Sequence, residues 1–200
     1  MCYAEVDRSA LVLGSTQPDS VVDRDRAEAA GVEVVRRRSG GGAVLLRPGE
    51  TVWVDVFLPA GDPLAEADVG RAFGWIGRAW VAALTLTGVG QAPGPPVAVH
   101  EGRPRAGPWS ATVCFAGLGP GEVTVGGAKV VGISQRRSRA GALFQCGALV
   151  AWSPEPLLDL LALSDDDRAA AGTALTAVAT GTGVDPARLI AAFESALDHA

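Results

Sequence analysis

Short segments of alternating or continuous apolar residues recur along the first 150 residues of the chain. This pattern is typical of β-strands, because successive side chains of a strand point to opposite faces of a sheet. The turn Arg47-Pro48-Gly49-Glu50 is expected to join two of these strands, 43–46 and 51–58, in a hairpin. The complete set of predicted strands is 3–7, 11–13, 32–35, 43–46, 51–58, 97–100, 112–115, 122–125, 128–134 and 143–150.

Helical periodicity appears in the middle of the chain and again at its end. Apolar residues recur at three- and four-residue spacing from Val69 to Leu84, which predicts one long helix over 64–87. Asp23 is a candidate N-cap for a short helix over 24–30. Further helices are predicted at 154–163, 165–180 and 186–199. This order of elements indicates an α+β fold with a central mixed, mostly antiparallel sheet flanked by helices. We expect one domain over residues 1–200, with a helical tail at 154–200.

Composition narrows the possible functions. Hydrophobic residues make up 48% of the chain and charged residues 20%, which excludes a disordered protein. The formal net charge of -5 disfavours a nucleic-acid partner. Cys2, Cys114 and Cys146 have no metal-binding spacing, so no metal site is predicted. No apolar run approaches the roughly 18 residues of a membrane span, and charges at positions 5, 7 and 8 argue against a signal peptide. We therefore expect a cytoplasmic protein with no membrane partner.

A glycine-rich loop is the first candidate binding site. The segment Arg36-Arg37-Arg38-Ser39-Gly40-Gly41-Gly42-Ala43-Val44 joins two predicted strands. Glycines let the backbone turn and let a ligand approach closely, and their N–H groups can line an anion site. Arginine and serine side chains can bind a phosphate. The loop is not a P-loop, because no Gly-Lys-Ser/Thr follows. A flexible hairpin loop with solvated arginines is the alternative interpretation.

The only lysine of the chain is the second candidate. Lys129 lies in Gly126-Gly127-Ala128-Lys129-Val130-Val131-Gly132, at the start of a predicted strand. Arginine is used at every other position where the chain has a lysine or an arginine. An ammonium there can hold a carboxylate and a phosphate together and stabilise developing negative charge. An edge-strand lysine that prevents aggregation is the alternative.

Together the two segments resemble a known family. Arg36 to Val44 resembles the RRxSGGGAV signature of lipoate–protein ligases, and Gly127-Ala128-Lys129-Val130-Val131-Gly132-Ile133-Ser134-Gln135-Arg136-Arg137 resembles their Gly-x-Lys-[Ile/Val]-x-Gly-x-x-x-Arg block. The similarity covers about residues 11 to 150 and extends to biotin–protein ligases and octanoyl transferases. It implies a biotin/lipoate ligase-like catalytic domain with an acyl tunnel beside the glycine loop.

The resemblance also implies a reaction and roles for residues. ATP and Mg²⁺ would activate lipoate or octanoate as an acyl-adenylate, and a lysine of a lipoyl-type carrier domain would then attack it. Lys129 would contact the acyl carbonyl. The implied nucleotide contacts are Arg37, Gly42, Ala43, Val44 and Leu45; Ser39 and Gly40 support the acyl-phosphate junction, and Gly41 and Gly132 complete the binding set.

The sequence departs from the family pattern in three places, and this leaves other mechanisms open. Phe144-Gln145-Cys146-Gly147 stands where ligases usually carry a histidine-rich segment. The extra C-terminal domain of some ligases has no counterpart before Ala200, so an accessory subunit is a possible partner. The family's leading helix also has no counterpart before Tyr3.

Cys114 supports a second mechanism. Cysteine-dependent octanoyl transferases of this superfamily place a Cys-Phe pair upstream of the lysine, and Cys114-Phe115 has a similar spacing to Lys129. A thiolate would take the acyl group as a thioester without ATP. A small buried cysteine is the alternative. A third interpretation is a non-catalytic protein that binds an acyl group or a nucleotide.

Overall fold

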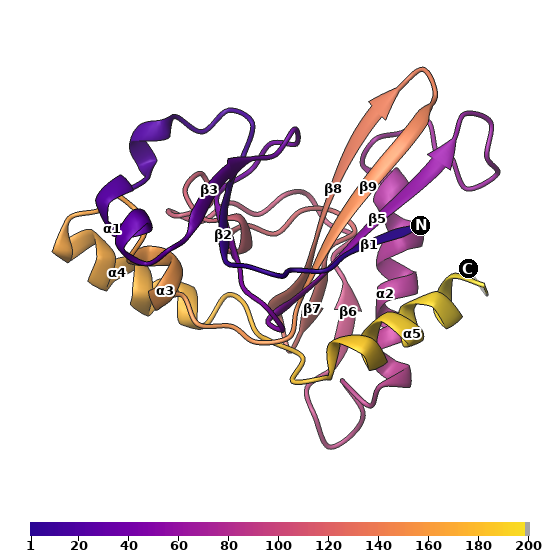
Figure 1. The fold of residues 1–200 in the computed structure, drawn as a ribbon. Helices are drawn as coiled ribbons and strands as arrows, with labels where there is room; N and C mark the ends of the chain where they lie inside the picture. The colour runs from indigo at the N-terminus through magenta and orange to yellow at the C-terminus, as the bar shows by residue number, and fades with distance from the viewer. Residues whose placement is uncertain (199–200) are drawn as a thin grey trace.

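The computed structural model describes residues 1–198, which form two β-sheets and the helices around them (Figure 1). The larger sheet has six antiparallel strands. In spatial order these are β1 (Cys2–Ala4), β5 (Thr51–Pro59), β9 (Gly141–Leu149), β8 (Ala128–Ser138), β7 (Val123–Val125) and β6 (Val97–Val99). The smaller sheet has the order β3 (Glu33–Arg36), β2 (Ala10–Leu13) and β4 (Val44–Leu46). Among the strands of residues 1–198, β2 and β3 are the one pair that runs parallel, so the predicted mixed, mostly antiparallel α+β fold is confirmed.

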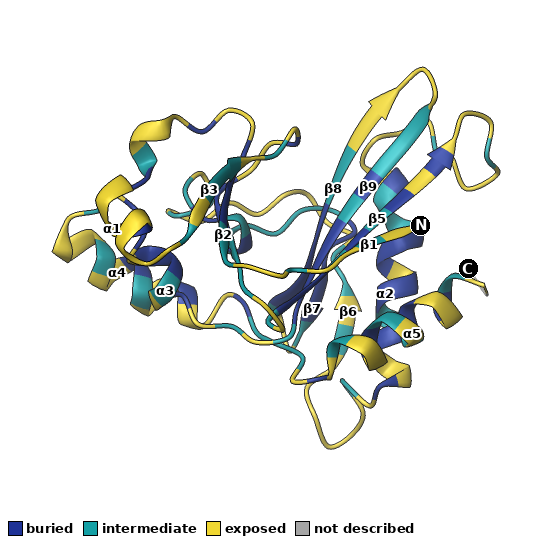
Figure 2. Ribbon diagram, in the orientation of Figure 1, coloured by how far each residue is buried: buried dark blue, intermediate teal, exposed yellow. Residues whose placement is uncertain are grey.

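Two helices cover one face of the larger sheet. They are α2 (Gly74–Leu86) and α5 (Pro186–Leu197), and their rings Trp80 and Phe193 stack with centroids 3.9 Å apart. The buried face of β5 supplies every second residue from Val52 to Leu58 to the same core. This alternation is what a strand with one buried face requires. The two helices cover one face of the larger sheet, and the smaller sheet lies on the other side (Figure 2).

The remaining helices pack beside the smaller sheet. α1 (Arg24–Ala29) begins at its predicted N-cap, since the Asp23 carboxylate accepts a hydrogen bond from the Arg26 N–H. α3 (Glu155–Leu158) and α4 (Asp165–Thr176) follow β9, and Ser164 caps α4. Three 3₁₀ turns complete the structure at Asp19–Val21 (η1), Arg71–Phe73 (η2) and Cys114–Ala116 (η3).

The predicted hairpin of 43–46 and 51–58 is wrong. β4 pairs with β2 in the smaller sheet, while β5 pairs with β1 and β9 in the larger one. The turn between them therefore carries the chain from one sheet to the other. A local apolar pattern predicts strands but not their partners, and here Val44 packs beside Val12 in a separate core cluster.

The long helix predicted over 64–87 is shorter, and it begins only at Gly74. Asp62 and Asp68 accept hydrogen bonds from backbone N–H groups two and three residues further along, at Leu64 and Arg71. Such local bonds compete with a helix. The predicted strand at 112–115 is also wrong, because the backbone turns there and continues as η3.

The predicted helices at 154–163 and 165–180 end early, at Leu158 and Thr176. The Arg168 guanidinium donates to the carbonyls of Leu158, Leu161 and Leu163. These backbone carbonyls between the two helices therefore have acceptor contacts without a continued helix. After α4 the backbone pairs instead with β8, through Lys129. The predicted helix over 186–199 is present as α5 up to Leu197, and residue 199 lies outside the described residues.

Candidate functional site

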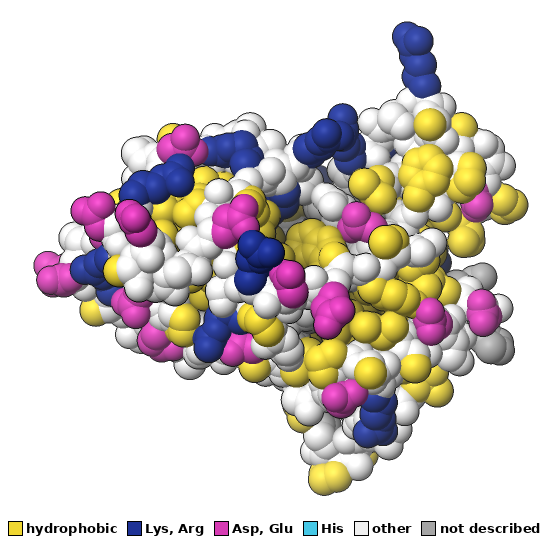
Figure 3. All heavy atoms as spheres, viewed as in Figure 1, with side chains coloured by type: hydrophobic (Ala, Val, Ile, Leu, Met, Phe, Trp, Pro, Cys, Tyr) yellow, Lys and Arg dark blue, Asp and Glu magenta, His cyan; other side chains and the backbone are white. Residues whose placement is uncertain are grey.

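A cavity of about 350 Å³ lies between the smaller sheet and the open face of the larger sheet. Figure 3 shows hydrophobic side chains at the base of a hollow between the two halves of the molecule, with basic side chains beside it. The cavity brings together residues that are far apart in the sequence. Of the sequence-predicted site residues, those that line it are Arg37, Gly40, Gly41, Gly42, Val44, Cys114, Lys129 and Gly132.

Three predicted residues are not among those that line this cavity. Ser39 is buried, and its hydroxyl lies 3.5 Å from the Oε1 atom of Gln145. Ala43 is fully buried, and its backbone bonds to Thr112 and Cys114. Leu45 pairs with Leu11 inside the smaller sheet. In this structure these three residues support the loop rather than face the cavity.

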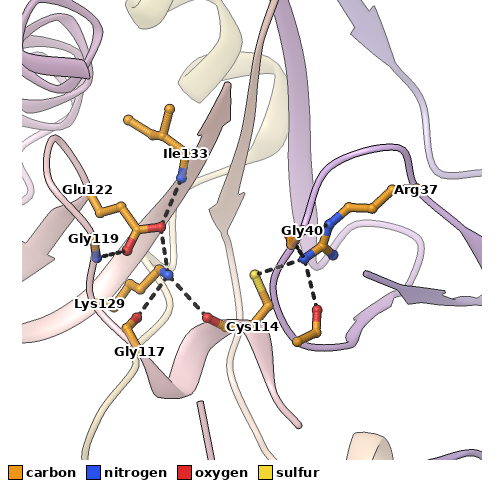
Figure 4. A network of polar contacts seen from close by, with 9 residues as sticks. Arg37, Gly40, Cys114, Gly117, Gly119, Glu122, Lys129 and Ile133 are labelled. Atoms are coloured by element: carbon orange, nitrogen blue, oxygen red, sulfur yellow. Dashed lines mark hydrogen bonds and ion pairs between the residues drawn. The ribbon is translucent and has the colours of Figure 1, made fainter. Parts of the chain in front are cut away.

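Lys129 is held in the cavity wall by its backbone and by its side chain. Its N–H donates to the Val178 carbonyl at 2.8 Å, and its own carbonyl accepts from the Thr180 N–H at 2.9 Å. The side chain is only 4% exposed. Its Nζ atom lies 2.8 Å from Glu122 Oε1, 3.2 Å from the Cys114 carbonyl oxygen and 3.0 Å from the Gly117 carbonyl oxygen (Figure 4). The three N–H bonds of the ammonium therefore each have an acceptor.

An aromatic ring completes the surroundings of Lys129. The Nζ atom lies 5.0 Å from the centroid of the Phe115 ring, within the range of a cation–π contact. A second cavity of about 250 Å³ shares Lys129, Phe115 and Arg105 with the first. The ammonium therefore lies in a wall that two cavities share.

The loop from β3 to β4 forms the facing wall. The Arg37 guanidinium folds back onto the loop and donates through Nη2 to the carbonyls of Gly40 and Gly42, each at 2.9 Å (Figure 4). Its Nη1 atom is buried and has no hydrogen-bond partner among the described residues. Gly41 has φ 103°, a conformation that favours glycine. Arg37 thus stabilises the loop through Nη2, while its Nη1 donor remains without a hydrogen-bond acceptor.

Cys114 opens onto the same cavity as Lys129. It is half-buried at the start of η3, and its Sγ atom lies 3.8 Å from Nη2 of Arg37. Cys146, in contrast, lies in β9 and is fully buried in the core between the larger sheet and its helices, where burial raises the pKa of its thiol to about 12. Of the two cysteines in the sheet region, Cys114 is the one with chemical access to a ligand.

Sequence reasoning missed Glu122 as a member of the site. This carboxylate is 7% exposed and forms the ion pair with Lys129. The neighbouring predicted strands were a partial signal: Glu122 lies just before β7 and Lys129 is the second residue of β8. The two strands form a hairpin in which Thr124 pairs with Lys129, a register that only the structure shows. Diagonal neighbours on one face of such a pair lie within reach of long side chains.

A group of hydrogen-bonded side chains on β5 and β9 was also missed. Trp53 and Gln145 line the cavity and both bond to the Asp55 carboxylate, Trp53 through Nε1 at 3.0 Å and Gln145 through Nε2 at 3.3 Å. Asp55 and Gln145 are directly opposite in the β5–β9 register. Their strand positions could not reveal this without the register.

Residues 1–198 contain neither a candidate metal centre nor a membrane-spanning helix. No group of three or more His, Cys, Asp or Glu side chains in this range is arranged to hold a metal ion. None of the described helices is both long and apolar enough to cross a membrane.

Comparison with solved structures shows what the fold is similar to. An archaeal bi-partite lipoate protein ligase from Thermoplasma acidophilum superposes with a TM-score of 0.70 and 17% identity, over 96% of this chain and 67% of that one. A suspected lipoate protein ligase from T. acidophilum, solved with bound lipoic acid, gives 0.66 and 16%, over 96% and 68%. A lipoate-protein ligase A bound with ATP gives 0.63 and 17%, over 96% and 68%. At these identities the likeness concerns the fold.

The sequence itself gives a more specific result. No curated protein sequence is a significant match to the chain. A profile of the lipoyl protein ligase A/B catalytic domain, however, matches residues 2–180, which is most of the chain. This range contains the glycine loop, Cys114, Glu122 and Lys129. The chain belongs to the lipoyl protein ligase A/B catalytic domain family.

Proposed function

We propose that this protein activates lipoate or octanoate as an acyl-adenylate and transfers the acyl group to a lysine of a lipoyl-type carrier domain. The observation that carries this proposal is a single cavity with the Lys129 ammonium on one wall and the Gly40 to Gly42 loop on the other. The fold likeness to structures solved with bound lipoic acid and with bound ATP supports both substrates.

The first step of the proposed reaction joins the acid to the nucleotide. A carboxylate oxygen attacks the α-phosphorus of ATP, and pyrophosphate leaves. Lys129 holds the attacking carboxylate and the α-phosphate, since a buried ammonium stabilises the negative charge that develops there. Arg37 offers the unpaired Nη1 donor to a phosphate oxygen. Mg²⁺ accompanies the phosphates of ATP, as is usual in nucleotide-dependent enzymes.

In the second step the carrier's lysine amine attacks the acyl carbonyl carbon. The bond to AMP breaks, an amide forms, and the amine gives up a proton. For Lys129 to contact the substrate in either step, a substrate oxygen replaces the carbonyl of Cys114 or Gly117 as acceptor. A family relative described as bi-partite supports an accessory subunit as a further partner. Free thiols and ATP use both fit a cytoplasmic location.

A thioester transferase is the second candidate. It is favoured by the position of Cys114, whose Sγ atom faces the cavity beside Arg37. In this mechanism the thiolate attacks the thioester carbonyl of an acyl-carrier protein, and the carrier's thiolate leaves. The amine of a lipoyl domain then attacks the new thioester and releases Cys114.

One experiment separates the candidates. Purified protein is incubated with octanoate, ATP, Mg²⁺ and a lipoyl carrier domain, and separately with octanoyl-carrier protein without ATP. Modification that requires ATP and survives Cys114→Ser supports the ligase. Modification without ATP that Cys114→Ser abolishes supports the transferase. Binding of octanoate or ATP with no modification in either assay contradicts both and indicates a non-catalytic binding protein.

Lys129→Arg tests the role common to both mechanisms. We expect a loss of turnover of about 100-fold or more, the usual cost of removing one well-placed donor. The charge is retained, but a planar guanidinium does not fit the space between Phe115 and the two carbonyls. Arg24→Lys, an exposed change between the same residue types, is the control. Near-normal turnover in Lys129→Arg would remove Lys129 from the mechanism.

A further inference from the structure

Glu122 is a buried carboxylate for which the proposed reaction has so far given no role. It lies just before β7, in the wall that carries Lys129, and is 7% exposed. Its Oε1 atom lies 2.8 Å from Lys129 Nζ and accepts a hydrogen bond from the Ile133 N–H at 3.2 Å. Its Oε2 atom accepts from the Gly119 N–H at 2.6 Å (Figure 4). Both oxygens are therefore held by the protein.

The surroundings explain why this carboxylate matters for Lys129. An isolated charge in an apolar interior is costly, and a buried lysine without a counter-charge tends to lose its proton. The other charged or titratable residues that line the cavity are Arg37, Arg105 and Cys114. Among the residues of that lining, Glu122 is the one carboxylate. It therefore places the one negative charge of this lining directly beside the Lys129 side chain.

The contacts of Lys129 differ in how firmly they are fixed. The two carbonyl acceptors, Cys114 and Gly117, belong to the η3 turn and the loop after it. Glu122, in contrast, is anchored from two sides, by the β8 backbone at Ile133 and by the turn at Gly119. A substrate oxygen can displace a carbonyl from the ammonium, whereas displacing Glu122 would break three polar contacts at once.

We infer that Glu122 is a positioning residue that keeps Lys129 charged and aimed at the acyl–phosphate junction. This inference rests on the proposed function, because it gives Lys129 its substrate. It adds Glu122 to the residues of the site. It also requires that the Lys129 ammonium exchange one of its carbonyl acceptors for a substrate oxygen while its ion pair with Glu122 stays in place.

The chain offers a direct measurement, because Lys129 is its only lysine. Protein labelled with ¹³C-lysine, with a lysine-free tag, gives one Cε resonance whose chemical shift reports the charge on Nζ. We expect the resonance of Glu122→Gln to titrate at lower pH than that of the wild type. We expect Glu122→Asp, which keeps the charge, to titrate nearer the wild type. Glu101→Gln, an exposed change in the same part of the chain, is the control.

The enzymatic readout is the pH profile of acyl transfer. In Glu122→Gln the alkaline limb should move to lower pH, and kcat should fall by about 10-fold to 100-fold with a smaller change in KM, the range seen when a residue that orients a functional group is removed. A purely structural role would lower the amount of folded enzyme and leave the pH profile in place. A resonance and a profile that both match the wild type overturn the inference.

Two further comparisons keep the test decisive. If Glu122→Gln does not fold, the double variant Glu122→Gln/Lys129→Met should fold and be more stable, because it removes both charges instead of leaving one unpaired; a double variant less stable than either single variant contradicts the inference. If the wild type shows no acyl transfer in any assay, the proposed function fails, whereas the lysine resonance still tests the dependence of Lys129 on Glu122.

Discussion

The three cysteines are expected to differ in reactivity by their positions. Cys2 is exposed, Cys114 is half-buried at the cavity and Cys146 is buried. Burial raises the pKa of Cys146 to about 12. We predict that a thiol reagent such as DTNB modifies two thiols in the folded protein and the third only after unfolding.

The same assay tests whether the two reactive thiols are those of Cys2 and Cys114. Cys114→Ser should leave one reactive thiol, and octanoate should slow the modification of Cys114 but not of Cys2. A third thiol that reacts as fast as the first two in folded protein would contradict the buried position of Cys146.

At the level of residues, the sequence predicted Lys129, Arg37 and Cys114 because each stands in a local motif with a recognisable chemistry. Glu122 and Asp55 have no such motif. Each is defined by a partner across a strand pair, Lys129 for Glu122 and Gln145 for Asp55. Their roles depend on the register, and a single sequence does not specify the register.

The loop between β3 and β4 depends on a close approach of two backbones. A Cβ atom at Gly42 would lie 2.5 Å from the Val113 carbonyl carbon and 2.7 Å from the Cys114 nitrogen, whereas a Cβ atom at Gly40 would meet nothing within 4 Å. We predict that Gly42→Ala lowers the free energy of unfolding by about 1–3 kcal/mol, the usual cost of overpacking. It should also weaken ATP binding, because it separates the loop from the strand bridge at Ala43 and Val113.

Gly40→Ala is the matched variant in the same loop. It should change the free energy of unfolding by less than about 0.5 kcal/mol, as is common for open positions. Chemical denaturation and calorimetric titration with ATP measure both effects. Equal losses in the two variants would show that the loop, and not its contact with residue 113, limits stability.

At the level of elements, the sequence predicted most strands and the C-terminal helices but not their pairing. The strands of 43–46 and 51–58 exist, and yet they belong to different sheets. Periodicity also extended the predicted helices beyond the start of α2 and the end of α3, where hydrogen bonds of the Asp68 and Arg168 side chains fix a non-helical backbone. Apolar patterns describe one face of a segment and carry no information about such bonds.

At the scale of the whole molecule, the site depends on how the two sheets are held together. The chain passes from the smaller to the larger sheet after β4, and it returns after β9 to α3 and α4. The segment after α4 then pairs with Lys129 before α5 packs against α2. The backbone of Lys129 in β8 is therefore hydrogen-bonded to the segment that follows α4. The order of elements in the sequence did not predict this contact.

A hydrogen bond joins β1, near the start of the described chain, to α5, near its end. Because its donor is a tyrosine hydroxyl, the stability of the protein at alkaline pH tests whether this contact forms. The Tyr3 hydroxyl of β1 donates to the Glu194 carboxylate of α5. Desolvation raises the pKa of Tyr3 above its usual value near 10.0, and the hydrogen bond and the charge of Glu194 raise it further. A raised pKa means that the folded state holds its proton more tightly, so the stabilisation is complete below about pH 10 and is lost as the pH rises above it.

We predict that the wild type loses thermal stability between about pH 10 and pH 11.5 more steeply than Tyr3→Phe, which lacks the ionisable group. At neutral pH Tyr3→Phe should be the less stable of the two, and the difference between their Tm values should shrink as the pH rises. The raised pKa of Cys146 acts in the same direction, but it is common to both proteins and cancels in the difference. Since Tyr3 is the only tyrosine, its absorbance change gives its ionisation directly. A Tm difference that stays constant across this pH range would show that β1 and α5 are not joined through Tyr3 in solution.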